Sequence, residues 1–138
     1  MTQKTILIVD DDPDVRLGLH VRLKANHYNV IFAVDGMASI AEARKHKPDL
    51  IILDLGLPAG DGFSVLERLE ANDSLSLIPV IVVSARDREA NMDRALKAGA
   101  KAFLQKPVDN AELLAVIRRV LGEPALPEKP IVHDLGSL

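Results

Sequence analysis

The chain has 138 residues, of which 48% are apolar and 27% are charged, a composition typical of a single globular domain. Its formal net charge of −3 argues against a protein that binds nucleic acid or a membrane surface electrostatically. One tyrosine and three phenylalanines are too few for a platform on which bases stack. Because cysteine is absent, disulfides, thiolate metal sites and a cysteine nucleophile are excluded. The N-terminal apolar run is too short for a signal peptide or a membrane span, so a cytoplasmic protein is expected.

Short apolar runs, rich in β-branched residues, recur along the chain and predict strands. None of them alternates polar with apolar residues, and continuous hydrophobic strands are typical of a parallel sheet that is covered on both faces. The predicted strands are residues 6–9, 30–32, 50–53, 80–83 and 102–104.

Longer amphipathic stretches separate these runs and predict helices. Asp12 followed by Pro13 is a typical helix start, and Asp109 and Gly122 are the expected cap and stop of the last helix. Right-handed crossovers would place the helices on both faces of one parallel sheet, so the predicted fold class is α/β. The three middle helices are expected at residues 36–46, 61–72 and 87–97.

The composition changes after Gly122. Residues 123–138 hold three of the eight prolines and have no helical stripe. We therefore expect residues 1–122 to form one domain and residues 123–138 to be a Pro-rich tail or linker.

Polar side chains follow four of the five predicted strands. Asp10 and Asp11 follow the first strand, Asp54 the third, Ser84 the fourth and Lys106 the fifth. Ligands of open parallel α/β sheets bind outside the C-terminal ends of the strands. The sequence therefore predicts that three carboxylates, a hydroxyl and an ammonium group converge at one edge of the sheet.

This set of groups predicts a magnesium ion and a phosphoryl group. Carboxylates held close together repel one another unless a cation lies among them, and a hard cluster of oxygen ligands favours Mg²⁺. The ammonium of Lys106 and the hydroxyl of Ser84 suit phosphoryl oxygens. The bond between Lys106 and Pro107 is a candidate cis peptide that would direct Lys106 inward. An acidic run also stabilises a helix N-terminus, and this role is sufficient for Asp12 and Asp14.

The chain resembles the receiver domains of response regulators over about residues 5–121. The resemblance rests on four pieces that follow one another in order at strand ends. They are ILIVDDDP at 6–13, PDLIILDLGLPAGDG at 48–62, PVIVVSA at 79–85 and FLQKP at 103–107. The resemblance implies a doubly wound (βα)5, flavodoxin-like fold with strand order 2-1-3-4-5.

The resemblance also implies the chemistry of the site. Asp54 would accept a phosphoryl group from the phosphohistidine of a histidine kinase or phosphotransfer protein, or from a small phosphodonor. Asp10, Asp11, Asp54 and the backbone carbonyl of Gly56 would hold Mg²⁺. Such a protein acts on itself as a phosphoryl acceptor and is not a conventional enzyme.

A switch is implied at Ser84 and Phe103. Ser84 and Lys106 would bind the phosphoryl oxygens, and movement of Ser84 would leave space for the ring of Phe103 to rotate. The surface of the fourth helix, fifth strand and fifth helix would then change and control an output domain or downstream protein. The same face is a candidate homodimer surface. The chain has Ser and Phe at these two positions, where Thr and Tyr are common in the family, and Gly56 leaves no side chain beside Asp54.

Other functions fit parts of the sequence. In a haloacid-dehalogenase-like phosphatase, Asp10 would be the nucleophile and Asp12 the general acid. That family also needs a pair of acidic residues after the lysine, and here only Asp109 lies between Lys106 and the last helix. A receiver-shaped binding module that is never phosphorylated is a second alternative. Flavin binding is disfavoured because no Gly/Ser/Thr-rich phosphate loop follows the first strand.

Overall fold

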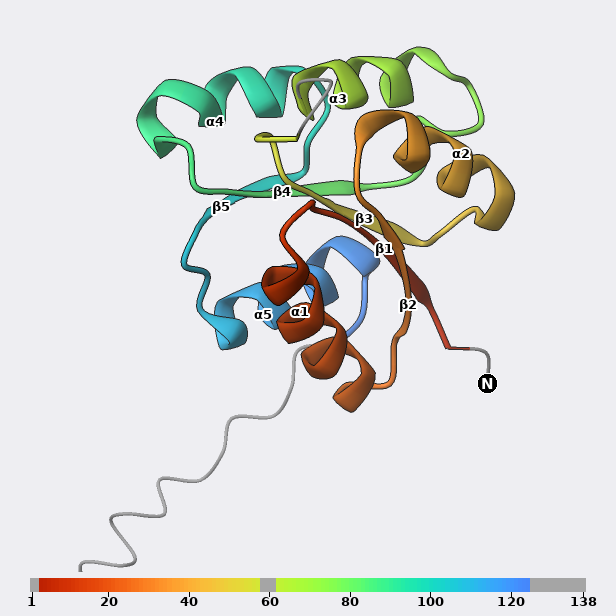
Figure 1. Ribbon diagram of the computed structural model, residues 1–138, viewed down its shortest axis with the longest axis vertical. Coiled ribbons are helices and arrows are strands. Elements are labelled where there is room, and N and C mark those ends of the chain that lie inside the picture. The colour runs from red at the N-terminus through yellow and green to blue at the C-terminus, as the bar shows by residue number, and fades with distance from the viewer. Residues whose placement is uncertain (1–2, 58–61, 125–138) are drawn as a thin grey trace, which may run out of the picture.

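A computed structural model describes residues 3–57 and 62–124 of the chain. Five strands form one parallel sheet in the order β2-β1-β3-β4-β5, as predicted. The helices α1 and α5 cover one face of the sheet and α2, α3 and α4 cover the other (Figure 1). The strands are β1 (Thr5–Val9), β2 (Asn29–Ala33), β3 (Leu50–Leu53), β4 (Val80–Ser84) and β5 (Ala102–Gln105). The helices are α1 (Pro13–Ala25), α2 (Gly36–His46), α3 (Gly62–Ala71), α4 (Arg88–Lys97) and α5 (Asn110–Leu121).

The two helices on the α1/α5 face begin where the sequence predicts. The Asp12 carboxylate accepts hydrogen bonds from two backbone N–H groups of the first turn of α1, and Pro13 occupies the first helical position. The Asp109 carboxylate accepts a bond from the N–H of Ala111 at the start of α5. Gly122 ends α5 in the left-handed conformation, with φ of +71°, a conformation that glycine adopts without steric cost.

The observed bounds differ little from the predicted ones. The strands extend by one residue at some ends, and α4 begins at Arg88, directly after its N-cap Asp87. The predicted start of the third helix, Asp61, and residues 125–138 of the predicted tail lie outside the described residues. Among the helices that the structure describes, none has the length and apolar character needed to cross a membrane.

Two hydrophobic layers hold the sheet between the helices. Along β1, Leu7 and Val9 pack toward α2 and α3, whereas Ile6 and Ile8 pack toward α1 and α5. All four side chains are 0% exposed. The continuous apolar runs therefore reflect strands that bury both faces, which is the arrangement expected of a parallel sheet.

The start of α3 lies unusually close to the end of β3. A Cβ atom at Gly62 would lie 2.5 Å from the Cα of Leu55, and the Gly62 N–H donates to the Leu55 carbonyl at 3.0 Å. Only glycine permits this approach without a backbone shift. The contact fixes α3 directly against the residue that follows Asp54.

Candidate functional site

The order of the strands brings the predicted site residues to one edge of the sheet. Because β1 and β3 are neighbours and Val9 pairs with Leu53, Asp10 and Asp54 emerge side by side. The Asp54 N–H still donates to the Val9 carbonyl at 2.9 Å, so the strand pairing continues into the site. On the other side, the Lys106 N–H donates to the Ser84 carbonyl at 2.9 Å. The convergence predicted from the sequence is confirmed.

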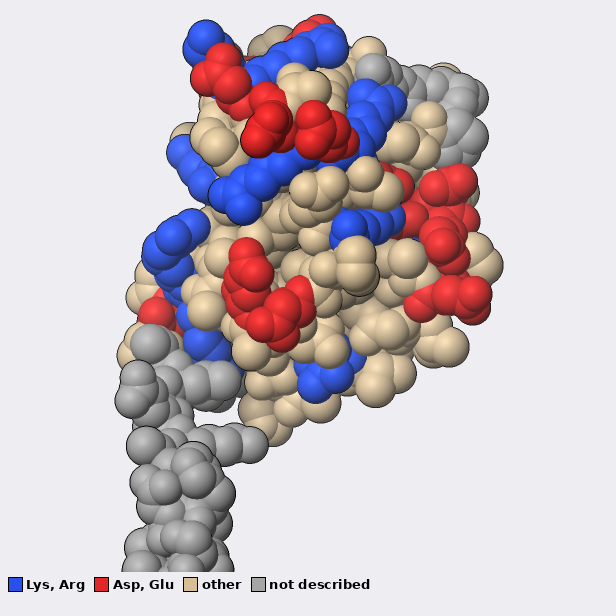
Figure 2. Space-filling model, turned by 90° about the vertical axis from the view of Figure 1, so that its left-hand side faces the viewer, with Lys and Arg blue, Asp and Glu red and all other residues tan. Residues whose placement is uncertain are grey.

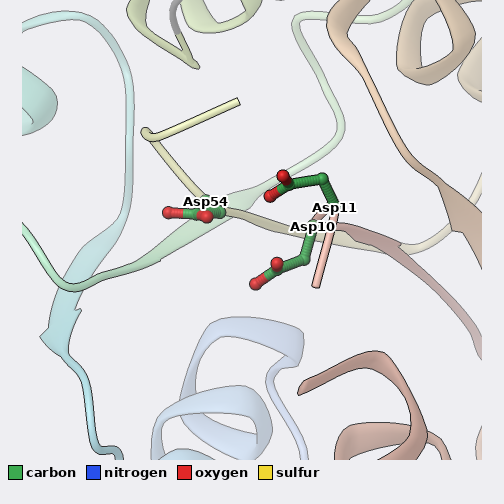
Figure 3. Close-up of side chains that lie close together, drawn as sticks. All are labelled: Asp10, Asp11 and Asp54. Atoms are coloured by element: carbon green, nitrogen blue, oxygen red, sulfur yellow. The ribbon is translucent and has the colours of Figure 1, made fainter. Parts of the chain in front are cut away.

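Three carboxylates form the centre of the site. Oxygen atoms of Asp10, Asp11 and Asp54 all lie within 4.8 Å of one another (Figure 3). Asp10 and Asp54 are buried, at 3% and 8% exposure, whereas Asp11 is exposed. Negative charges at this separation repel strongly at the intermediate dielectric of a partly buried site. Within residues 3–57 and 62–124, this is the cluster of acidic side chains suited to a metal ion.

Lys106 supplies a positive charge inside the cluster. Its Nζ atom lies 2.8 Å from Asp10 Oδ2 and 3.4 Å from Asp54 Oδ2. Burial acts to lower the pKa of Lys106, but the hydrogen bond and charge of Asp10, together with Asp54, outweigh it and hold the pKa above its ordinary value. The Lys106–Pro107 peptide is cis, as anticipated from the sequence. The ammonium group therefore stays charged between two carboxylates.

Backbone hydrogen bonds orient the acidic side chains. Asp10 Oδ1 accepts from the N–H of Asp12 at 2.9 Å, and Asp54 Oδ1 accepts from the N–H of Gly56 at 3.1 Å. In each carboxylate the other oxygen, Oδ2, faces Lys106. A Cβ atom at Gly56 would lie 3.8 Å from Asp54 Oδ1, an ordinary van der Waals distance, so the backbone here would also accept a small side chain.

Ser84 and Phe103 occupy adjacent strands behind the carboxylates. Ser84 is fully buried, and its Oγ accepts from the N–H of Arg86 at 3.1 Å. Phe103 is 4% exposed and lies opposite Val82 on the neighbouring strand, two residues before Ser84. Phe103 packs into the hydrophobic layer between the sheet and α2–α4.

Three arginine side chains make contacts near the site that no sequence motif predicts. Arg16 of α1 donates from Nη1 to the Asp10 carbonyl at 2.8 Å and so fixes the backbone at the end of β1. Arg94 of α4 stacks on the ring of Phe63, with 3.8 Å between the guanidinium carbon and the ring centroid. The guanidinium carbon of Arg86 lies 5.9 Å from the same centroid. Arginines are so common on protein surfaces that only the folded structure distinguishes these three.

Comparisons with known proteins agree with this geometry. Residues 6–118 match the family profile described as the response regulator receiver domain. The chain is 37% identical over 116 residues to the protein PilH of Pseudomonas aeruginosa, covering 84% of this chain and 96% of PilH. It is 40% identical over 114 residues to the response regulator PleD of Caulobacter vibrioides, covering 82% of this chain but only 25% of PleD. The chain thus spans about a quarter of that relative.

A solved structure gives the same result. The receiver domain of the sensor histidine kinase PA1611 from Pseudomonas aeruginosa PAO1 superimposes with a TM-score of 0.81 at 28% identity. The match covers 88% of this chain and all of that domain, which was solved with a magnesium ion coordinated in its active site cleft.

Proposed function

Because the chain belongs to the family of response-regulator receiver domains, we propose that it is a phosphoryl-accepting switch whose acceptor is Asp54. The observation that carries the proposal is the position of Asp54, which is buried beside two further carboxylates and has one oxygen 3.4 Å from the ammonium of Lys106. A carboxylate held in this way is a nucleophile with a fixed orientation.

The proposed reaction transfers a phosphoryl group from a phosphohistidine to Asp54. A carboxylate oxygen attacks phosphorus, the bond between phosphorus and the imidazole nitrogen breaks, and a mixed anhydride forms on Asp54. Catalysis of such a step is mainly positioning and charge stabilisation. Lys106 neutralises charge on the phosphoryl oxygens. The Ser84 hydroxyl can donate its proton to one of these oxygens, because in its hydrogen bond with the Arg86 N–H the Oγ atom acts only as acceptor.

The donor set fits a magnesium ion. Asp10, Asp11 and Asp54 offer hard carboxylate oxygens within 4.8 Å, and the backbone carbonyl of Gly56 is the proposed further ligand. When bound, Mg²⁺ supplies positive charge that offsets the carboxylates and the transferring phosphoryl group. The repulsion among the three carboxylates, only partly relieved by Lys106, supports this assignment.

The proposed phosphodonor is a sensor histidine kinase or phosphotransfer protein of the cytoplasm. An apolar cavity of about 420 Å³ adjoins the site and supports docking of such a partner, because an apolar helix seated there would bring its histidine near Asp54. Its lining includes Val15, Leu19, Val83 and Pro107, with Lys106 at the boundary to the site.

Output is proposed to pass through the face formed by α4, β5 and α5. Figure 2 shows this face, where basic and acidic side chains surround apolar surface. A groove of about 260 Å³ on it is lined by Phe103 and Val116 together with Arg88, Lys101 and Arg119. Movement of Ser84 toward the phosphoryl group, followed by rotation of the Phe103 ring into the vacated space, would alter this groove. The partner is an output domain, a separate protein or a second copy of the chain, with residues 1–122 as the receiver unit and residues 123–138 as the tail or linker.

Intact mass spectrometry tests the proposal. Incubated with Mg²⁺ and acetyl phosphate, the protein is expected to gain one phosphoryl group of about 80 Da, which hydroxylamine removes because it is a mixed anhydride. Asp54→Asn should not gain it, whereas Asp73→Asn, which changes an exposed aspartate just after the end of α3, should label normally. Equal labelling of Asp54→Asn would overturn the proposal and favour the phosphatase alternative with Asp10 as nucleophile.

A further inference from the structure

A second cavity lies away from the phosphoryl site, at the opposite ends of the strands. It has a volume of about 510 Å³ and is bounded by the start of β1, the turn before β2 and the end of α5. Its lining includes Lys4, His27, Tyr28, Arg118 and Glu123. This volume is within the range of sites that bind small organic molecules, and it is much larger than a simple inorganic anion requires.

Glu123, the carboxylate in the described lining of the cavity, is already compensated. Tyr28 donates its hydroxyl to Glu123 Oε1 at 2.5 Å. Glu123 Oε2 lies 3.7 Å from Lys4 Nζ, and the same ammonium donates to the Leu121 carbonyl at 3.3 Å. Both oxygens of Glu123 therefore have partners that offset its charge, so the carboxylate has little capacity left to neutralise a second cation.

In the described lining, Arg118 is a cation that Glu123 does not pair with. Its Nε atom is shielded from solvent and has no hydrogen-bond acceptor within residues 3–57 and 62–124. A buried donor left without an acceptor destabilises a protein, and the effect is larger when the donor is charged. Because Arg118 lines the cavity, an oxyanion there would pair with its guanidinium group, whose planar shape suits carboxylate and phosphate oxygens. His27 lines the same cavity and would add positive charge when protonated.

We propose that this cavity binds a small organic anion, whose carboxylate or phosphate group pairs with Arg118 and whose apolar part fills the remaining volume. The walls favour such a ligand because most of the surface that lines the cavity is carbon. Glu123 directly follows the C-cap of α5, so the ligand contacts the point at which the chain leaves the receiver unit. The proposal does not depend on phosphorylation of Asp54.

The fluorescence of Tyr28 provides the measurement, because it is the only tyrosine and the chain has no tryptophan. The full chain is titrated with cyclohexanecarboxylate, cyclohexyl phosphate, inorganic phosphate and the neutral analogue cyclohexanol. We expect a saturable change with at least one of the two organic anions. We expect at least about tenfold weaker binding of inorganic phosphate and cyclohexanol, since each lacks one of the two recognised groups. The stronger of the two organic anions identifies the oxyanion class.

Two matched variants identify the residue. Arg118→Gln should weaken binding of the preferred anion at least about tenfold, whereas Arg44→Gln, which removes the same charge from the exposed surface of α2, should leave it unchanged. Arg118→Lys keeps the charge and should bind with intermediate affinity. Thermal melts of each variant verify that it is folded. The proposal is overturned by absence of saturable binding, by equal affinity for cyclohexanol, by inorganic phosphate binding as tightly as the organic anions, or by unchanged binding in folded Arg118→Gln.

Discussion

Lys106 Nζ lies closer to Asp10 Oδ2, at 2.8 Å, than to Asp54 Oδ2, at 3.4 Å. Before any reaction, the ammonium is therefore held mainly by a proposed metal ligand and less by the proposed acceptor. This arrangement stabilises the buried Asp10 carboxylate and leaves the Asp54 carboxylate less tightly paired with the ammonium. It also explains how three carboxylates can lie within 4.8 Å in a folded protein.

Replacing Lys106 by Met should destabilise the fold. Asp10 is 3% exposed, and removing its cation leaves a buried charge without compensation, at a cost of about 1–3 kcal/mol in the free energy of unfolding. Urea unfolding at neutral pH in EDTA measures the change. Lys97→Met is the control, because its partner Asp93 is highly exposed and such pairs contribute less than about 1 kcal/mol. Equal losses in the two variants would mean that Lys106 does not compensate Asp10.

Replacing Asp11 by Asn should have the opposite effect. Asp11 is exposed and adds a third negative charge to the cluster, so its neutralisation should raise the unfolding midpoint in EDTA. Millimolar Mg²⁺ should stabilise the wild type by binding the folded state, and should stabilise Asp11→Asn much less because a direct ligand is weakened. Thermal melts with EDTA or Mg²⁺ test both effects. Identical midpoints under all conditions would contradict a shared metal site.

Tyr28 should titrate at unusually high pH. Its burial, and then the hydrogen bond and charge of Glu123, raise the pKa of Tyr28 from 10.0 to about 12, against the opposing charge of Arg118. A raised pKa means that the folded state holds the proton more tightly, so this stabilisation is complete below about pH 10 and is lost as pH rises toward 12. Tyrosinate absorbance reports Tyr28 alone.

The variant Glu123→Gln is the control for that titration. Because it removes the negative charge beside the phenol, it should move the apparent pKa of Tyr28 toward 10, although burial remains. A wild-type pKa near 10, or no change in the variant, would show that the contact between Tyr28 and Glu123 does not persist in solution.

The proposed switch makes a prediction for NMR. On addition of beryllofluoride and Mg²⁺, which mimic the phosphoryl group, chemical shifts should change at the site and also at Phe103 and along α4. In Ser84→Ala the site should still respond, but the change at Phe103 should be smaller because the hydroxyl that moves toward the phosphoryl group is missing. Changes confined to the loops after β1, β3 and β5 would contradict coupling between the two regions.

The sequence predicts the strand ends well and the contacts at them less well. Asp10, Asp54 and Lys106 follow unambiguous apolar runs, so their convergence follows from parallel strand order alone. Which carboxylate Lys106 prefers depends on side-chain geometry across 96 positions of the chain, and no local pattern encodes it. Arg16 likewise reaches the Asp10 carbonyl only once α1 has packed.

The second cavity could not have been predicted. Lys4, Tyr28 and Arg118 belong to no motif, and they meet only because β1, β2 and α5 are adjacent in the folded chain. Glu123 is the first residue of the predicted tail, yet its side chain accepts a hydrogen bond from buried Tyr28. Composition marks where the regular pattern ends, but it does not reveal contacts made just beyond that point.

The site of phosphorylation is the most direct test of the proposed function. The wild-type protein is treated with Mg²⁺ and acetyl phosphate, the mixed anhydride is reduced with borohydride, and the peptides are sequenced by mass spectrometry. Reduction converts a phosphorylated aspartate to homoserine, so the account predicts homoserine at position 54 and at no other aspartate. Homoserine at position 10 in place of position 54, or its absence from both positions in a protein that binds Mg²⁺, would contradict it.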